Sequence, residues 1–311
     1  MRTNLPRLVL LLLCLLSAAA QAQPPWSRLV VFGDSLSDPG NAFVLTGQVA
    51  TPPYALIPDA PYAVGGLHFS NGPTWIEQLA QALGDPSAGP ALRAPEVFGN
   101  YAVGAARARD TQWLDLGEQL ALFLDHYDGI APADALYVIM VGGNDVRDAL
   151  AALAADPSGA ASLAIVQGAV AAVADALTVL AEAGARHVLV ANAPDIAQVP
   201  AVSAQGPLVQ WAAGALAGAY NAALAQTLDA LAPLLPLTVH RLDLFAVLRA
   251  VTRDPATYGF TDAATPCITP GVVVDAICED PDAHLFWDGI HPTRAGHAVV
   301  ARAAAATLGL P

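Results

Sequence analysis

Short runs of apolar residues alternate along this chain with longer segments that have helical spacing. We expect strands where the residues are almost continuously hydrophobic, at 29–32, 98–105, 135–141, 187–192 and 237–242. The expected helices cover 75–83, 115–127, 160–183, 208–231, 244–251 and 293–308. Strands without polar alternation, separated by helices, are typical of a parallel sheet covered on both faces. The pattern therefore predicts an α/β fold with three layers, in which helices cover both sides of one sheet.

Two stretches lack any sustained period and are expected to be long surface loops. They cover residues 39–73 and 252–286. Loops of this length usually carry function or are mobile, and the first of them directly follows the first expected strand. We therefore expect residues 39–73 to form one wall of a pocket. No internal repeat or linker divides the chain, which predicts a single domain over residues 23–311.

Polar clusters follow the expected strands at the points where the strands end. They are Gly33–Asp38, Gly104, Gly142–Asp145 and Asn192–Asp195. In parallel sheets of this kind, sites lie at the carboxyl ends of the strands. Each cluster alone is also ordinary turn chemistry, but together they predict one site at this edge of the sheet.

Composition excludes some classes of partner. The formal net charge is -14, from 27 acidic residues and 13 basic ones, all of them arginine. Nucleic-acid binding depends on neutralising phosphates with Lys and Arg, so this acidic balance argues against it and against a tight electrostatic hold on anionic lipid. A chain of 311 residues buries enough apolar surface to fold without a metal, and we expect neither a metal nor another cofactor.

The first 22 residues have the organisation of a signal peptide. Arg2 and Arg7 give a positive start, and Leu8–Leu16 is an apolar run too short to span a bilayer. Ala20–Ala22 reads as a small-x-small cleavage site. The alternatives are a membrane anchor and a lipid attached to Cys14, where the bulky Leu13 is unsuitable. We expect export to the periplasm or the medium, with no integral membrane segment in the mature chain.

Two cysteines remain after removal of the signal peptide. They are Cys267 and Cys278, and their proximity in an exported chain favours a disulfide. The alternative is two unpaired thiols. A zinc site is disfavoured because no nearby histidine or cysteine completes a tetrahedral set of ligands.

Ser35 and His291 are the candidate nucleophile and base. Ser35 lies where a buried strand breaks into a turn, although its surroundings are not a Gly-x-Ser-x-Gly elbow because Ser37 replaces the final glycine. His291 lies three residues after Asp288 in a turn bounded by Gly289 and Pro292. A carboxylate that orients a histidine, which in turn activates a serine, is the logic of a catalytic triad. Alone, each residue is also explained as turn or surface chemistry.

Gly104 and Asn144 are candidates for an oxyanion hole. A glycine lets a backbone N–H approach a substrate closely, and the Asn144 amide can donate a second hydrogen bond. The alternatives are a plain turn at Gly104 and an Asx-turn or helix cap at Asn144.

Four ordered blocks give the chain a resemblance to a known family. Gly33–Asp38, Asn100–Ala105, Gly142–Asp145 and Asp288–Pro292 together resemble the sequence blocks of the GDSL, or SGNH, lipases and esterases. Phe69–Trp75 also looks like a segment of the larger lipase/phospholipase branch of that family.

The resemblance implies a flavodoxin-like α/β/α fold without a metal. It implies Ser35 as nucleophile, His291 as base and Asp288 as the group that orients it. The implied oxyanion hole combines the backbone N–H groups of Ser35 and Gly104 with the Asn144 side chain. Pro39 and Ala106 depart from the usual pattern, which puts loop shape in doubt rather than chemistry.

The function expected from these features is hydrolysis of carboxylic esters by a secreted serine esterase or lipase. The apolar loop at 39–73 favours small-molecule or lipid esters over highly charged substrates. Alternatives are transfer of the acyl group to an alcohol, deacetylation of a polysaccharide, and a binding protein that has lost catalysis. Oligomeric state does not follow from the sequence.

Overall fold

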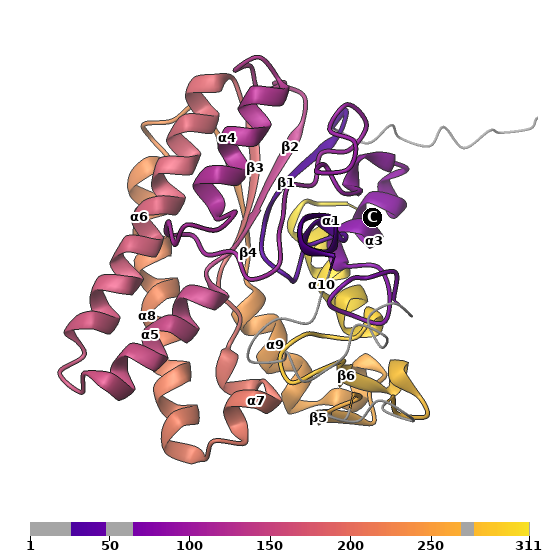
Figure 1. Ribbon diagram of the computed structural model, residues 1–311, viewed down its shortest axis with the longest axis vertical. Coiled ribbons are helices and arrows are strands. Elements are labelled where there is room, and N and C mark those ends of the chain that lie inside the picture. The colour runs from indigo at the N-terminus through magenta and orange to yellow at the C-terminus, as the bar shows by residue number, and fades with distance from the viewer. Residues whose placement is uncertain (1–25, 48–64, 269–276, 311) are drawn as a thin grey trace, which may run out of the picture.

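The computed structural model describes residues 26–47, 65–268 and 277–310. Its main sheet has four parallel strands in the order β1-β2-β3-β4 (Figure 1). The strands are β1 (Leu29–Gly33), β2 (Leu136–Met140), β3 (His187–Ala191) and β4 (Thr238–Leu242). Gly33 pairs with Met140, which pairs with Ala191. The strands are therefore in phase, and their carboxyl ends meet at one edge of the sheet.

The segment expected as a strand at 98–105 lies beside β1 but forms only an isolated bridge. Asn100 pairs with Val31 in parallel, and the Tyr101 and Val103 N–H groups donate to Val31 O and Gly33 O at 2.8 and 3.1 Å. On the other side of this segment, the Asn41 Nδ2 atom donates to the carbonyl oxygens of Asn100 and Ala102, at 2.8 and 2.9 Å. These carbonyl groups are therefore hydrogen-bonded to a side chain where a further strand would otherwise pair. Placed beside β1, the segment completes the flavodoxin-like order.

Helices cover both faces of the sheet. Figure 1 shows α4, α6 and α8 on one side and α3 and α10 on the other. The helices of the described chain are α1 (Asn41–Thr46), α3 (Trp75–Leu83), α4 (Leu116–His126), α5 (Gly143–Ala155), α6 (Ala160–Ala183), α7 (Pro200–Ser203), α8 (Pro207–Leu231), α9 (Leu244–Arg253) and α10 (Arg294–Thr307). The predicted three-layer α/β/α fold is confirmed.

Alternation along the strands divides the core into two layers. Val30 and Phe32 of β1 belong to the cluster that includes α4, α6 and α8, whereas Leu29 and Val31 pack with α3 and α10. All four are buried, which explains why the strand reads as a continuous apolar run. Full burial of such side chains stabilises the fold by about 1.5–3 kcal/mol each.

Several helices and strands lie where none was expected. α1 falls within 39–73, and α5 directly follows the polar cluster after β2. Within 252–286, β5 (Asp262–Pro266) pairs in parallel with β6 (His284–Phe286). The expectations for residues 1–22, and for residues 48–64 of the first long loop, lie outside the described residues.

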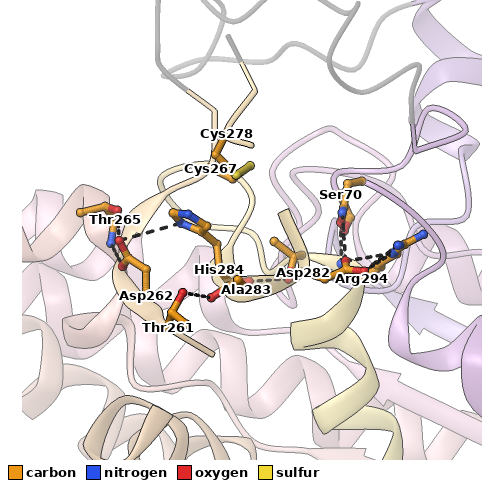
Figure 2. Close-up of a disulfide and its surroundings, with 12 residues drawn as sticks. Ser70, Thr261, Asp262, Thr265, Cys267, Cys278, Asp282, Ala283, His284 and Arg294 are labelled. Carbon is orange, nitrogen blue, oxygen red and sulfur yellow. Dashed lines mark hydrogen bonds and ion pairs between the residues drawn. A yellow bond between two sulfur atoms is a disulfide. The ribbon is translucent and has the colours of Figure 1, made fainter. Parts of the chain in front are cut away.

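A disulfide joins Cys267 to Cys278, as predicted. Figure 2 shows it beyond the small sheet, near His284 of β6. The Cys267 and Ile268 N–H groups donate to Phe286 O and Trp287 O at 2.9 and 2.8 Å. The bridged segment therefore continues the β5–β6 pairing and supports the chain immediately before Asp288.

The disulfide is expected to remove both free thiols from the folded chain. Thiol titration of protein purified without reductant should find no reactive cysteine among Cys267 and Cys278, and two after denaturation with reductant. Closing an 11-residue separation stabilises by about 3 kcal/mol in the chain-entropy model, so reduction should lower the unfolding temperature. Two titratable thiols before reduction would contradict the pairing.

Helix α6 is the one described helix that is long and apolar enough to cross a membrane, by length and composition. Its buried side chains include Val166, Val173 and Leu180, and these belong to the same core cluster as β1 and α8. The helix therefore packs as a core element of this fold, and the described residues indicate no integral membrane segment.

Candidate active site

The turn that carries Ser35 is fixed by the end of β1. The Gln119 side chain accepts from the Gly33 N–H and donates to the Gly33 carbonyl, both at 2.8 Å. A Cβ at Gly33 would lie 2.6 Å from Met140 O, so the close approach of β1 and β2 requires glycine there. Asp34 then accepts from the Leu36 N–H at 3.0 Å, which holds Ser35 at the corner of the turn.

The turn that carries His291 is built in a similar way by Asp288. Phe286 and Pro292 form an antiparallel bridge around it. The Asp288 Oδ1 atom accepts from the backbone N–H groups of Ile290 and His291 at 2.8 and 2.7 Å. In this Asx-type turn the other carboxylate oxygen, Oδ2, faces the His291 ring.

The two turns meet at the carboxyl edge of the sheet. His291 Nε2 lies 2.8 Å from Ser35 Oγ, and His291 Nδ1 lies 2.6 Å from Asp288 Oδ2. A carboxylate can only accept, so Nδ1 carries the proton and Nε2 accepts from the serine hydroxyl. Asp288 is fully buried, while Ser35 and His291 keep 9% and 7% exposure. The reactive pair therefore touches the surface and the carboxylate does not.

The carboxylate is held in its ionised form. Burial acts to raise the pKa of Asp288, but the charge of His291 and the hydrogen bonds from His291 and Ile290 outweigh it and lower this pKa below its usual value. In contrast, burial raises the pKa of Asp34 to about 6, against the Leu36 N–H and the charges of His291 and Arg147. Two carboxyl groups near the same serine thus differ in protonation behaviour because their partners differ.

Asn144 lies in the first turn of α5 with its amide orientation determined by two partners. Its Nδ2 atom donates to Ala106 O at 2.9 Å, and its Oδ1 atom accepts from Arg147 at 3.0 Å. The amide nitrogen has two hydrogens, and only one of them faces Ala106. The second is the donor that the oxyanion prediction requires.

The Gly104 N–H is engaged elsewhere, because it donates to Asp38 Oδ2 at 2.7 Å. A contribution of Gly104 to an oxyanion hole therefore requires exchange of this hydrogen bond. Across the described ranges, no acceptor contacts the backbone N–H of Ser35 or of Ala105. Ala105 has a left-handed φ of 69°, an unusual conformation for alanine that re-aims the chain next to the site.

Three side chains near the site were not predicted. Arg147 sets the orientation of the Asn144 amide, as described above. Asp38 accepts from the backbone at Gly40, Asn41, Ala42 and Gly104, and so ties α1 to the segment beside β1. Asp145 accepts from the Ala108 N–H at 2.8 Å and from the Arg109 Nε–H at 2.8 Å. The repeated Asp in these polar clusters was the available signal, but the distant partners, Gly104 for Asp38 and Ala108 and Arg109 for Asp145, do not follow from it.

One group of carboxylates lies together outside the site. Oxygen atoms of Asp110, Asp115 and Glu118 lie within 4.8 Å of one another. Asp115 already accepts from the backbone N–H groups of Arg107 and Thr111 at 2.7 and 2.6 Å. These bonds assign Asp115 to shaping the loop before α4.

If Asn144 has the predicted oxyanion role, Asn144→Ala is expected to slow hydrolysis of a carboxylic ester by about 10²–10³-fold, the usual effect of losing one such donor. The effect should fall on kcat rather than KM. Asn192→Ala is a matched control, because Asn192 also follows a strand but bonds to Asp243 and Phe245. Equal losses in the two variants, measured with p-nitrophenyl butyrate, would contradict the assignment of Asn144.

Comparison with known proteins agrees with this geometry. The family model of the GDSL-like lipase/acylhydrolases matches residues 29–304. A phosphatidylcholine-sterol acyltransferase of Aeromonas hydrophila is 26% identical, over 94% of this chain and 93% of its own. A GDSL esterase/lipase of Arabidopsis thaliana is 26% identical over 85% of this chain and 82% of its own.

A solved structure is similar in fold. The crystal structure of a catalytic mutant of an acetylxylan esterase from Geobacillus stearothermophilus aligns over 93% of this chain and 98% of its own, with a TM-score of 0.51 and 16% identity. At this identity the likeness concerns the fold alone. The family match, which covers nearly all of the described sheet and helices, shows that the chain belongs to the GDSL-like lipase/acylhydrolase family.

Proposed function

We propose that this protein is a serine esterase or lipase that hydrolyses carboxylic esters through an acyl-enzyme on Ser35. The observation that carries the proposal is the continuous hydrogen-bonded chain from Ser35 through His291 to Asp288, with distances of 2.8 and 2.6 Å. Family membership supports a hydrolytic enzyme. In this proposal Ser35 is the nucleophile, His291 the general base and Asp288 the group that orients the imidazole.

The first half of the reaction forms the acyl-enzyme. Ser35 Oγ attacks the ester carbonyl carbon while His291 Nε2 takes its proton. The bond to the alcohol oxygen then breaks, and His291 returns the proton to that oxygen. The negatively charged Asp288 stabilises the imidazolium formed between these steps. In the second half, water replaces the alcohol and the same proton transfers release the acid.

The developing oxyanion requires donors on the side of the carbonyl away from His291. The Ser35 N–H and the second hydrogen of the Asn144 amide are the proposed donors. Arg147 fixes the amide from behind through its hydrogen bond to Oδ1. Gly104 remains a proposed donor on the condition that Asp38 releases its N–H during the reaction.

The proposal is tested by assaying the wild-type chain with p-nitrophenyl butyrate and other short-chain esters. It expects steady hydrolysis, with a burst of p-nitrophenol when the acyl-enzyme accumulates. Hydrolysis must disappear with Ser35→Ala. A wild-type protein without activity on any uncharged carboxylic ester would contradict the proposal.

Acyl transfer to an alcohol is the second candidate. It is favoured by the likeness to the Aeromonas hydrophila phosphatidylcholine-sterol acyltransferase, which extends over 93% of that protein. The same acyl-enzyme serves both outcomes, and the acceptor alone differs. Product analysis with an added sterol or simple alcohol distinguishes them: ester formation identifies a transferase, and free acid alone identifies a hydrolase.

Export belongs to the same proposal. We assign residues 1–22 to a signal peptide and 23–311 to a single catalytic domain located in the periplasm or the medium. The Cys267–Cys278 disulfide supports an oxidising compartment. The proposed substrate is a small-molecule or lipid ester, and neither nucleic acid nor a cofactor has a part in the mechanism. Sequencing the N-terminus of the exported protein tests the assignment, which expects it to begin at Gln23.

A further inference from the structure

An apolar cavity opens beside Ser35 at the carboxyl edge of the sheet. Helices α9 and α10 supply part of its wall, and the remainder comes from Met140 of β2 and from residues of neighbouring elements and turns. The cavity has a volume of about 80 Å³, several times the volume that one water molecule needs. No residue of the described parts of 39–73 lines this cavity. The predicted loop wall stays a prediction for residues 48–64, which lie outside the described residues.

The two helices present regularly spaced apolar faces to the cavity. On α9 the lining residues are Leu244, Val247, Leu248 and Val251. They recur at intervals of three and four, which places them on one side of a helix. Val299 and Val300 line it from α10. The sequence thus builds a continuous hydrocarbon-lined space next to the nucleophile.

Charged and polar side chains of the wall lie mainly at the Ser35 end. Asp34, Asn144 and Arg147 share the wall with Ser35. The remaining titratable group is His297, whose burial lowers its pKa to about 3 and keeps the ring neutral at physiological pH. The body of the cavity therefore suits an uncharged apolar chain whose polar end reaches Ser35.

The position of His291 decides which part of the ester enters the cavity. The leaving alcohol must lie close to Nε2, because it takes its proton from there. Ser35 and Asn144 line the cavity, whereas His291 does not, and the ring of Phe69 packs against the His291 ring at 5.1 Å. An alcohol group near His291 is thus directed away from the cavity, and the acyl chain is directed into it.

We infer that the cavity between α9 and α10 binds the acyl chain of the substrate and makes the enzyme prefer straight, uncharged acyl groups longer than acetyl. The inference rests on the proposed esterase function and names its substrate class. During acylation the chain occupies the cavity, its carbonyl carbon bonds to Ser35 Oγ, and the alcohol leaves outside with the proton from His291. Water then enters along the path that the alcohol vacates.

A chain-length series tests the inference. With p-nitrophenyl acetate, butyrate, octanoate and laurate, kcat/KM is expected to rise by up to about fourfold per methylene buried until the cavity is full. Val247→Trp, which fills part of the cavity, should remove most of that rise. Ala246→Trp is the matched control, since Ala246 is exposed on the neighbouring face of α9, and it should keep the wild-type series.

A binding measurement keeps the test independent of turnover and of folding. The Ser35→Ala variant should bind sodium laurate in calorimetry, and Val247→Trp added to it should weaken binding at least about tenfold while its circular dichroism stays unchanged. Leu248→Ala, which enlarges the space, should shift the preferred ester to a longer chain. A flat chain-length series in the wild type, or laurate binding unaffected by Val247→Trp, would overturn the inference.

The two proposals fail in distinguishable ways. If Ser35→Ala keeps its activity, the proposed catalytic mechanism is wrong, and laurate binding still decides the role of the cavity. If Ser35→Ala is inactive but Val247→Trp slows acetate and octanoate equally, the esterase stands and the cavity does not hold the acyl chain.

Discussion

The Ser35→Ala variant is expected to hydrolyse p-nitrophenyl butyrate at least about 10⁴-fold more slowly than the wild-type chain. The hydroxyl of Ser35 lies 2.8 Å from His291 Nε2 and is the nucleophile of the proposed mechanism, so its loss removes the acyl-enzyme altogether. Residual hydrolysis would come from substrate binding and the oxyanion donors. Measured kcat should therefore collapse, and binding of laurate should remain.

Ser203→Ala is the matched control for this variant. Ser203 lies in α7, and its hydroxyl donates to Pro200 O at 3.3 Å rather than to a member of the proposed triad. It should keep activity within about twofold and unfold at a similar temperature. A Ser35→Ala protein that folds normally and retains more than about a tenth of the wild-type rate would contradict the assignment of the nucleophile.

Asp288→Asn is expected to lower kcat by about 10⁴-fold with little change in KM. The carboxylate accepts from the His291 ring and from two backbone N–H groups. An asparagine that keeps those two bonds presents its amide NH₂ to the His291 ring. The ring then carries its proton on Nε2, where it cannot accept the proton of Ser35. The loss follows from the wrong tautomer rather than from a displaced ring.

Asp282→Asn is the matched control for Asp288→Asn. Asp282 lies six residues earlier and forms a surface ion pair with Arg294 (Figure 2), which contributes at most about 1 kcal/mol. The Asp282→Asn variant should keep its activity within a few-fold of wild type. Similar losses in both variants, or an Asp288→Asn enzyme within tenfold of wild type, would argue against the orienting role.

The sequence predicted the structure best where burial restricts the residue type over several successive positions. The runs at Leu29–Gly33 and Leu136–Met140 are buried along their whole length, and continuous burial leaves a continuous hydrophobic signal. Ser35 was predictable at the carboxyl edge of the main sheet because it follows β1. His291 follows β6 of the small sheet, so its pairing with Ser35 was predicted from triad chemistry and the family resemblance. The two residues are 256 positions apart in the sequence, and the fold brings Ser35 Oγ to 2.8 Å from His291 Nε2.

Elements fixed by distant side chains were not predictable in the same way. The helix α5 begins with Gly143, Asn144 and Asp145, residues that are also typical of turns, and Asp145 is used by Ala108 and Arg109 instead of by its own helix. The segment around Asn100 has strand composition but bonds to Asn41 on its outer side. The secondary-structure propensity of a segment does not reveal hydrogen-bond partners that are distant in the sequence.

The cavity wall is a further case. The loop after the nucleophile was expected to form one wall of the pocket. Its described parts, 39–47 and 65–73, do not line the cavity, whereas α9 and α10 do. Both helices were predicted, but a helix face that lines a cavity has the same spacing as one that packs in a core. Only the arrangement in space separates these two uses.

Labelling with a fluorophosphonate, followed by mass spectrometry of the modified peptide, tests the central claim most directly. The probe reacts with a serine only when a base activates it, so it reports the Ser35–His291 contact at 2.8 Å without any assumption about substrate. We predict one adduct per chain, on Ser35, that is lost in a folded His291→Ala variant. An adduct on another serine, or none on Ser35 in a protein that hydrolyses esters, would contradict the account.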